Sequence, residues 1–299
     1  MIYMKKAAKK YPRRFGDRPD GRKLRSLDPL YCVSPYIMKK RSSSSNLFSG
    51  TLDITEVEKY IRTKRAEGNP KLGMLHFFVA SYVRIISQHP GLNRFISGQK
   101  IFSRFGILVN LSVKKELTID GQETTIKAYL EPEDTINDVY EKLQKEIAEG
   151  KKIGDTNGTD KTARIIKFIP GLALKFVIWF LELLDYFGCL PKSLLHISPF
   201  HGSIFISDLG SIGIPPVFHH LYDFGNIPIF LCFGTKIRRM VTDREGKAQE
   251  RVFMDFTLAM DERICDGYYF SRALRTFRHI FKDPAVLDLP PDNVINDVD

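Results

Sequence analysis

Two hydrophobic periods alternate along this 299-residue chain, and their order limits the folds that it can adopt. Apolar residues recur at every second position in segments typical of half-buried strands, and at three- and four-residue spacing in segments typical of amphipathic helices. The expected strands are residues 47–54, 106–113, 123–130, 203–207, 229–233 and 252–260, and the expected helices are residues 55–65, 75–86, 136–150 and 268–281. Because strands and helices are interspersed without strict alternation, we predict an α/β sandwich with a mixed sheet.

The basic residues gather at the N-terminus. Residues 1–41 hold 13 Lys and Arg against 3 Asp, an excess that equals the net charge of +10 for the whole chain. We expect residues 1–30 to form a basic arm, residues 31–282 a globular domain, and residues 283–299 a C-terminal tail. Such an arm is either a solvated leader or surface strand, or it binds a polyanion. No RNA-binding, zinc-finger or helix-turn-helix pattern accompanies it, so no nucleic-acid partner is expected.

The four cysteines, Cys32, Cys189, Cys232 and Cys265, are scattered and form no C-x-x-C pair. This spacing argues against a zinc site and against a disulfide framework, so we expect no metal. The basic N-terminus also lacks the apolar stretch that a secretory signal needs. A reducing cytoplasm is therefore the expected location.

One long apolar segment, residues 168–190, reads FIPGLALKFVIWFLELLDYFGCL. Lys175, Glu182 and Asp185 interrupt it and fall on one narrow stripe of a helix with 100° per residue. Three interpretations stay open. The helix packs in a core or a subunit interface, it contacts a membrane surface or an acyl chain, or it crosses a membrane.

Several short motifs occur in a characteristic order. Phe205–Gly213 reads FISDLGSIG and Met260–Gly267 reads MDERICDG, and Ser34–Arg41, Leu52–Thr55 and Phe77–Phe95 precede them. Together they resemble the catalytic domain of the 2-oxoacid dehydrogenase dihydrolipoyl acyltransferases and chloramphenicol acetyltransferase. The resemblance covers roughly residues 30–282. It implies a chloramphenicol acetyltransferase-like two-layer sandwich with a mixed sheet, an acyltransferase-like catalytic domain over residues 31–282, and an apolar helical insertion at about 160–195.

The resemblance implies an acyltransferase that uses coenzyme A, with acyl-CoA as substrate, a small unidentified acceptor, and active sites between the subunits of a homotrimer. In the family motif H-x-x-x-D-G the histidine deprotonates the attacking thiol or hydroxyl, and a neighbouring subunit's Ser or Thr hydroxyl stabilises the oxyanion. Ser207 stands at that hydroxyl position, followed by Asp208 where many members have Asn or Ser. No lipoyl-attachment turn precedes the motifs, so a free-standing catalytic domain is expected.

Glu262 occupies the position of the family's histidine. A carboxylate with a pKa of about 4.3 is roughly two units less basic than imidazole, so Glu262 would act as a base only if burial raised its pKa. The alternative is a structural residue paired with Arg263 or Arg41 in a protein that no longer catalyses. Asp266 matches the motif's aspartate, and we expect it to be structural, either bonded to an arginine as in the family or as the N-cap of the final helix.

Two adjacent histidines offer a substitute base. His219 and His220 lie in the segment that, in the family, follows the serine strand and runs beside the subunit interface. Neighbouring residues of an extended chain point to opposite faces, so at most one of them faces the site. We expect His220 to be the base, with His201 as a further candidate. Ordinary turn or interface histidines are the alternative, and a metal site would need a third ligand.

Three functions follow from these patterns. The first is a coenzyme A-dependent acyltransferase with a displaced or altered general base. The second is a non-catalytic trimeric scaffold that lost the family's histidine. The third is a membrane-associated acyl-transfer protein, which the 168–190 segment and the basic N-terminus indicate.

Overall fold

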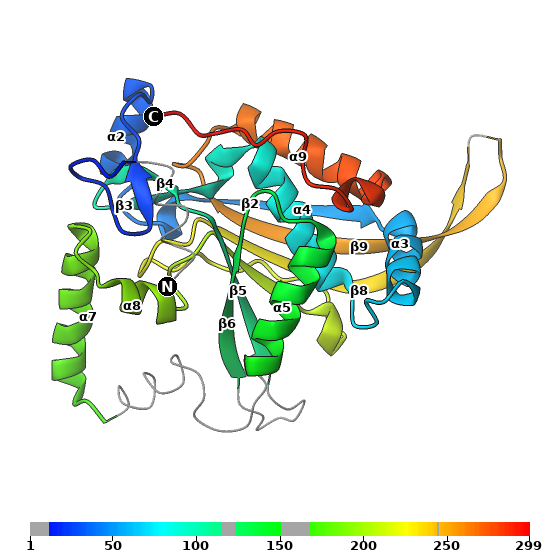
Figure 1. Cartoon of the computed structure of the whole chain (residues 1–299), viewed down its shortest axis with the longest axis horizontal. Helices are drawn as coiled ribbons and strands as arrows, with labels where there is room; N and C mark the ends of the chain where they lie inside the picture. The colour runs from blue at the N-terminus through cyan, green and yellow to red at the C-terminus, as the bar shows by residue number, and fades with distance from the viewer. Residues whose placement is uncertain (1–11, 115–122, 151–167, 244) are drawn as a thin grey trace.

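The computed structural model describes residues 12–114, 123–150, 168–243 and 245–299 (Figure 1). Its main sheet has the strand order β2-β9-β8-β7-β5-β6, in which β5, β7 and β8 run parallel and the other pairs are antiparallel. These strands are β2 (Ser45–Asp53), β5 (Ile107–Lys114), β6 (Glu123–Leu130), β7 (Ile204–Asp208), β8 (Ile229–Thr242) and β9 (Ala248–Asp261). The prediction of an α/β sandwich with a mixed sheet is confirmed.

The helices α3 (Thr55–Ala66), α4 (Met74–Gln88), α5 (Ile136–Gly150) and α9 (Gly267–Lys282) form the second layer. Each repeats apolar residues at three- and four-residue spacing, so one face of each helix joins a single core with the sheet. In that core the ring of Phe78 on α4 stacks on Phe233 of β8 with centroids 4.3 Å apart, and Phe281 of α9 lies against both Phe77 and Phe78.

The other face of the sheet follows from the two-residue alternation of the strands. Ile206 of β7 points into the helical core and is buried, whereas Phe205 and Ser207 point to the opposite face. A small apolar cluster forms there around Leu221, Phe230, Cys232 and Ala259. Tyr222 from the segment that follows β7 packs against this cluster.

The basic N-terminal segment differs from the solvated arm that we expected. Residues Gly21–Lys23 form β1, which pairs with β4 (Lys100–Arg104), and β4 pairs with β3 (Arg94–Ser97) in a three-stranded sheet. Arg18 and Asp20 just before β1 are each only 2% exposed. The short helix α2 (Pro29–Ile37) follows. Residues 18–24 are therefore part of the folded body and not a solvated leader, and β1 is the strand that the alternative allowed. Residues 1–11 of the expected arm lie outside the described residues.

The C-terminal tail also packs on the domain. The Asp297 carboxylate accepts two hydrogen bonds from the Arg94 guanidinium, at 2.6 and 2.9 Å, and Ile295 N donates to Ser87 O at the end of α4. Arg94 also donates to Ile264 O. The tail therefore supports the turn that follows β9.

The hairpin of β8 and β9 is longer than predicted. The strands pair from Ile229 and Met260 out to Thr242 and Ala248, and the distal half extends beyond the rest of the sheet (Figure 1). Most side chains of this half are polar and exposed. The sequence pattern missed it because its strands bury no face, so apolar alternation is absent.

The apolar segment forms α7 (Gly171–Tyr186), followed by the short helix α8 (Lys192–Ile197). No residue of α7 is buried, so the helix does not pack in the core of the chain. Its exposed apolar side chains recur along one stripe: Leu172, Phe176, Trp179, Phe180, Leu183 and, just beyond the helix, Phe187. Within the ranges that the structure describes, no helix is both long and apolar enough to cross a membrane.

Candidate active site

Ser207 lies near the end of β7, on the sheet face that the helices leave uncovered. Its register partner on β8 is Cys232, which in turn pairs with Thr257 on β9. The backbone alternation that sends Ile206 into the core therefore aligns hydroxyl and thiol groups across three neighbouring strands on the outer face. Ser207 is half-buried.

The segment between β7 and β8 carries both candidate histidines and is held at several points. Thr257 Oγ1 donates to Val217 O at 2.6 Å, and Leu221 is buried. Arg41 then donates to the carbonyls of Tyr222 and Gly225, at 2.6 and 2.9 Å. These anchors before and after residues 219 and 220 fix the segment over the outer face of the sheet.

His219 lies flat on that face. Its ring stacks on Phe230 with centroids 3.9 Å apart and an interplanar angle of 3°. Phe230 stacks in turn on Phe205 at 4.7 Å. The Nδ1 atom of His219 lies 3.3 Å from the carbonyl oxygen of His220. Because a carbonyl can only accept, Nδ1 carries the hydrogen and Nε2 keeps a free lone pair.

A pocket of about 430 Å³ opens on this face. Apart from Pro199, its lining residues carry aromatic rings or hydroxyl groups: Ser112, Thr125, Phe200, Phe205, Ser207, His219, Tyr222 and Phe230. The structure thus brings Ser207 and His219 together in one cavity. His220, which the sequence favoured, does not line it and is exposed.

Glu262 lies elsewhere. It follows the last residue of β9, and its main-chain N donates to Ser44 O at 2.9 Å. Ser207 is level with Thr257, so five residues along the strand and two strands across separate Ser207 from Glu262 by about 20 Å. Within one chain these two side chains cannot act on the same substrate atom.

The ion pairs that we considered for Glu262 are made by its neighbour Asp261. The Asp261 carboxylate accepts from Arg263 Nε at 2.8 Å and Nη2 at 2.7 Å, and it lies 3.6 Å from Arg41 Nε. All three side chains are almost fully buried. Burial lowers the pKa of Arg41, although Asp261 opposes that shift. The pairing of Glu262 with Arg263 or Arg41 is therefore wrong, because the carboxylate one residue earlier takes both arginines.

Asp266 is the N-cap of α9. Its carboxylate accepts from Tyr269 N at 2.7 Å and from the Tyr31 hydroxyl at 2.9 Å. The bond to the helix N-terminus holds the pKa of Asp266 below its usual range, with the Tyr31 bond acting in the same direction. Of the two structural roles considered for Asp266, the structure shows the helix cap.

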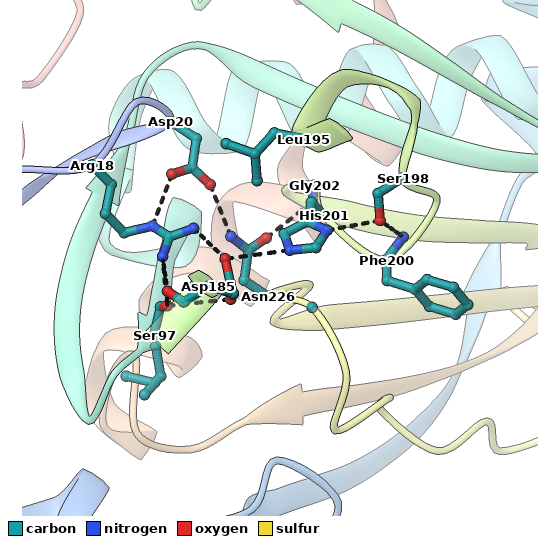
Figure 2. Close-up of polar contacts among 12 residues, drawn as sticks. Arg18, Asp20, Ser97, Asp185, Leu195, Ser198, Phe200, His201, Gly202 and Asn226 are labelled. Atoms are coloured by element: carbon teal, nitrogen blue, oxygen red, sulfur yellow. Dashed lines mark hydrogen bonds and ion pairs between the residues drawn. The ribbon is translucent and has the colours of Figure 1, made fainter. Parts of the chain in front are cut away.

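The sequence patterns missed a buried polar cluster (Figure 2). Arg18 donates to Asp20 at 2.9 Å and to Asp185 of α7 at 2.6 Å, and His201 Nε2 lies 3.5 Å from Asp185. Burial alone would raise the pKa of Asp185, but His201 and Arg18 hold it well below its usual range. Burial also lowers the pKa of His201. The cluster joins segments distant in sequence, so residue spacing gave no signal for it.

No group of three or more His, Cys, Asp or Glu side chains suited to a metal ion occurs in the described part of the chain. The buried Cys232 and Cys265 are free thiols, and burial raises the pKa of Cys232 to about 11 and that of Cys265 to about 12. Neither thiol is a ready nucleophile near neutral pH.

Comparison with known proteins agrees with this architecture. Residues 192–289, which include Ser207, His219 and Glu262, match the family described as 2-oxoacid dehydrogenases acyltransferase (catalytic domain). No curated protein sequence matches the chain.

Three solved structures share the fold across most of the chain. A probable dihydrolipoamide acetyltransferase from Listeria monocytogenes has a TM-score of 0.55 at 15% identity, covering 88% of this chain and 95% of that one. The dihydrolipoamide acetyltransferase of Azotobacter vinelandii has a TM-score of 0.55 at 14% identity, covering 88% and 93%. The cubic core of a pyruvate dehydrogenase multienzyme complex has a TM-score of 0.50 at 14% identity, covering 86% and 88%. The chain thus has the fold of the dihydrolipoamide acetyltransferases, and its residues 192–289 match the family of 2-oxoacid dehydrogenase acyltransferase catalytic domains.

Proposed function

We propose that this protein transfers an acyl group from acyl-CoA to a small acceptor in the pocket beside Ser207, with His219 as general base. The observation that carries the proposal is the shared pocket: it places one hydroxyl donor and one imidazole with a free Nε2 lone pair around the same open space. These are the two groups that acyl transfer needs, an oxyanion donor and a proton acceptor.

In this mechanism the acceptor's thiol, hydroxyl or amine attacks the thioester carbonyl carbon while His219 Nε2 takes its proton. The carbonyl oxygen gains negative charge and accepts a hydrogen bond from Ser207 Oγ. The tetrahedral intermediate then breaks its C–S bond and expels the coenzyme A thiolate, which takes the proton back from the imidazolium. Stacking on Phe230 holds the His219 ring in place through both proton transfers.

Glu262 has no catalytic step in this proposal. It follows the end of β9, about 20 Å from Ser207, and the described residues offer its carboxylate no hydrogen bond or ion pair. The structural relative from Azotobacter vinelandii has been studied for the catalytic roles of a serine, a histidine and an asparagine. In this chain the motif's histidine position is Glu262, so we assign the proton transfer to a histidine from the segment after β7.

A homotrimer belongs to the proposal. The outer face of the sheet and the segment over it expose apolar side chains that include Leu47, Ile212, Ile214, Val217 and Phe218. Exposed apolar groups gathered on one side of a protein are typical of an interface. A neighbouring copy packed there would close the pocket from solvent, which strengthens the hydrogen bond to the oxyanion.

The test is acyl transfer itself. Acetyl-, propionyl- and longer acyl-CoA are incubated with panels of thiols, alcohols and amines, and released coenzyme A is measured while light scattering gives the particle mass. Ser207→Ala is expected to lower kcat by about 10²- to 10³-fold, because one oxyanion donor is lost. Ser49→Ala, on the same sheet face but on the outer strand, is the matched control and should keep full activity.

Two outcomes would contradict the acyltransferase. One is a fully active Ser207→Ala protein. The other is calorimetry that detects no acyl-CoA binding at millimolar concentration. In the second case a non-catalytic trimeric scaffold becomes the better proposal.

One observation supports a second role, contact with a membrane surface. The stripe of α7 exposes Leu172, Phe176, Trp179 and Leu183, aromatic and aliphatic groups typical of helices that lie in a lipid interface. Five Lys and Arg between residues 161 and 192 accompany it in the sequence, which suits anionic lipid. In this role α7 would bring the acyltransferase to lipid-bound substrates.

Vesicle binding tests this second role. Wild-type protein should sediment with vesicles that contain anionic lipid, and Trp179→Ser should weaken the partition by about 10-fold because one buried aromatic side chain is lost. Met240→Ser, an exposed apolar residue on the distal hairpin, is the control and should bind as wild type. Equal binding of the two variants, or no binding of wild type, would exclude the lipid contact.

A further inference from the structure

A second pocket, of about 390 Å³, lies beneath the C-terminal end of α7. Its walls come from residues 39–41, the turn at 96–99, the end of α7 at 182–186, His201, and residues 223–225. It is separate from the pocket beside Ser207, and the two share no lining residue. Nothing in the proposed acyl transfer uses it.

The buried groups around this pocket carry an excess of positive charge. The described cluster contains four buried arginines, Arg18, Arg41, Arg104 and Arg263, but only three aspartates, the buried Asp20 and Asp261 and the half-buried Asp185. Burial lowers the pKa of Arg104 to about 10, which agrees with incomplete compensation. A buried charge without a partner is costly, so a bound anion would stabilise this cluster.

The charged groups at the rim nearly balance. Lys39 and Lys40 are exposed on one side, and Glu182 is exposed on the other. Asp223 also lines the pocket, but its carboxylate already accepts from Ser42 N and Ser42 Oγ, at 2.9 and 3.0 Å. The positive excess of the site therefore comes from the buried arginines below the rim.

Two buried donors in the pocket wall lack an acceptor. Ser198 Oγ accepts from Phe200 N at 3.3 Å and lies 2.7 Å from His201 Nδ1 (Figure 2). His201 Nε2 faces the Asp185 carboxylate, which can only accept, so we place the hydrogen of His201 on Nε2. This atom is buried and has no hydrogen-bond partner in the structure, because Asp185 at 3.5 Å is too distant for a good bond. Arg41 Nε, 3.6 Å from Asp261, is likewise without one.

We propose that this pocket binds an anionic group, a phosphate or a carboxylate, which accepts hydrogen bonds from His201 Nε2 and Arg41 Nε while Lys39 and Lys40 attract it at the rim. A buried donor left unsatisfied destabilises the site, so an oxyanion that satisfies two of them gains affinity beyond its charge.

Calorimetry with inorganic phosphate, inorganic pyrophosphate and acetate at low ionic strength tests this proposal without any turnover. Wild-type protein should bind at least one of the three with a Kd in the range of about 0.1–10 mM. Replacing both rim lysines, Lys39→Ala with Lys40→Ala, should weaken binding about 10-fold. Glu182→Gln should tighten it several-fold, since a like charge is removed. All three side chains are exposed, so the variants should fold.

Lys71→Ala, an exposed lysine before α4, is the control and should leave the affinity unchanged. Competition then separates two sources of the anion. Displacement of pyrophosphate by coenzyme A but not by pantetheine identifies the phosphates of the acyl donor, whereas binding that coenzyme A leaves unaffected identifies a free anion. The proposal fails if none of the three anions binds saturably, or if Glu182→Gln weakens their binding, which would indicate a cation site. Either failure leaves the acyl-transfer proposal standing, because Ser207 and His219 lie in the other pocket.

Discussion

Replacing His219 by alanine is expected to lower kcat for acyl transfer by about 10²- to 10⁴-fold, the usual contribution of a positioned general base. The reason is geometric. His219 Nδ1 faces the carbonyl oxygen of His220, which leaves the Nε2 lone pair free at the pocket that also contains Ser207. His219→Gln keeps a side chain of similar size over Phe230 but removes the basic nitrogen, so the loss should be comparable. Initial rates at saturating acyl-CoA measure both variants.

The adjacent histidine is the matched control. His220→Ala removes an exposed imidazole that does not line the pocket, and its kcat should stay within about threefold of wild type. A large loss in His220→Ala together with an active His219→Ala protein would show that the sequence-based choice of His220 was right. Loss of turnover in Glu262→Gln alone would instead assign the base to the carboxylate at the motif position.

The choice between the two histidines shows what residue spacing can predict. Backbone alternation predicted that at most one of them faces the site, but it could not say which; in the structure their rings lie 5.1 Å apart and only His219 lines the pocket. The choice depends on a tertiary contact, the stacking of His219 on Phe230, and on the anchors at Val217 and Tyr222 that set the height of the segment above the sheet. Ser207, in contrast, was placed correctly on a strand because its apolar neighbours Phe205 and Ile206 fix the alternation.

The polar cluster around Asp185 marks the limit of sequence-based prediction. The polar stripe of the apolar helix was visible in the sequence, but its partners Arg18 and His201 lie 167 residues before Asp185 and 16 residues after it. No periodicity relates these positions, since the contacts form only when β1, β3 and the end of α7 meet. The charge of the N-terminal segment indicated a solvated arm because the sequence does not show that Arg18 has carboxylate partners. In the fold Arg18 is buried beside two carboxylates.

The second large effect is a loss of folding stability on replacing Asp261, the residue before Glu262. Asp261→Asn is expected to lower the free energy of unfolding by about 3–5 kcal/mol, because it leaves two buried arginines without their carboxylate. The asparagine side chain could accept one hydrogen bond from Arg263 through its oxygen. Its NH₂ group would then face the second N–H donor of the same guanidinium, which the Asp261 carboxylate accepts from. The melting temperature should fall by roughly 10 °C, and denaturant titration should show a lower midpoint.

Glu262→Gln is the control for this effect, one residue further along the same turn. Its side chain makes no described ion pair, so its stability should stay within about 0.5 kcal/mol of wild type. If Asp261→Asn unfolds at the same denaturant concentration as Glu262→Gln, the pairing of Asp261 with Arg263 and Arg41 contributes nothing to the fold. If Asp261→Asn is destabilised and Glu262→Gln is not, Asp261 is the acidic residue that stabilises the turn after β9. Through its ion pair with Arg41, it also supports the segment that carries His219. A chain without the family's histidine can then keep the architecture of the motif while a different histidine supplies the base.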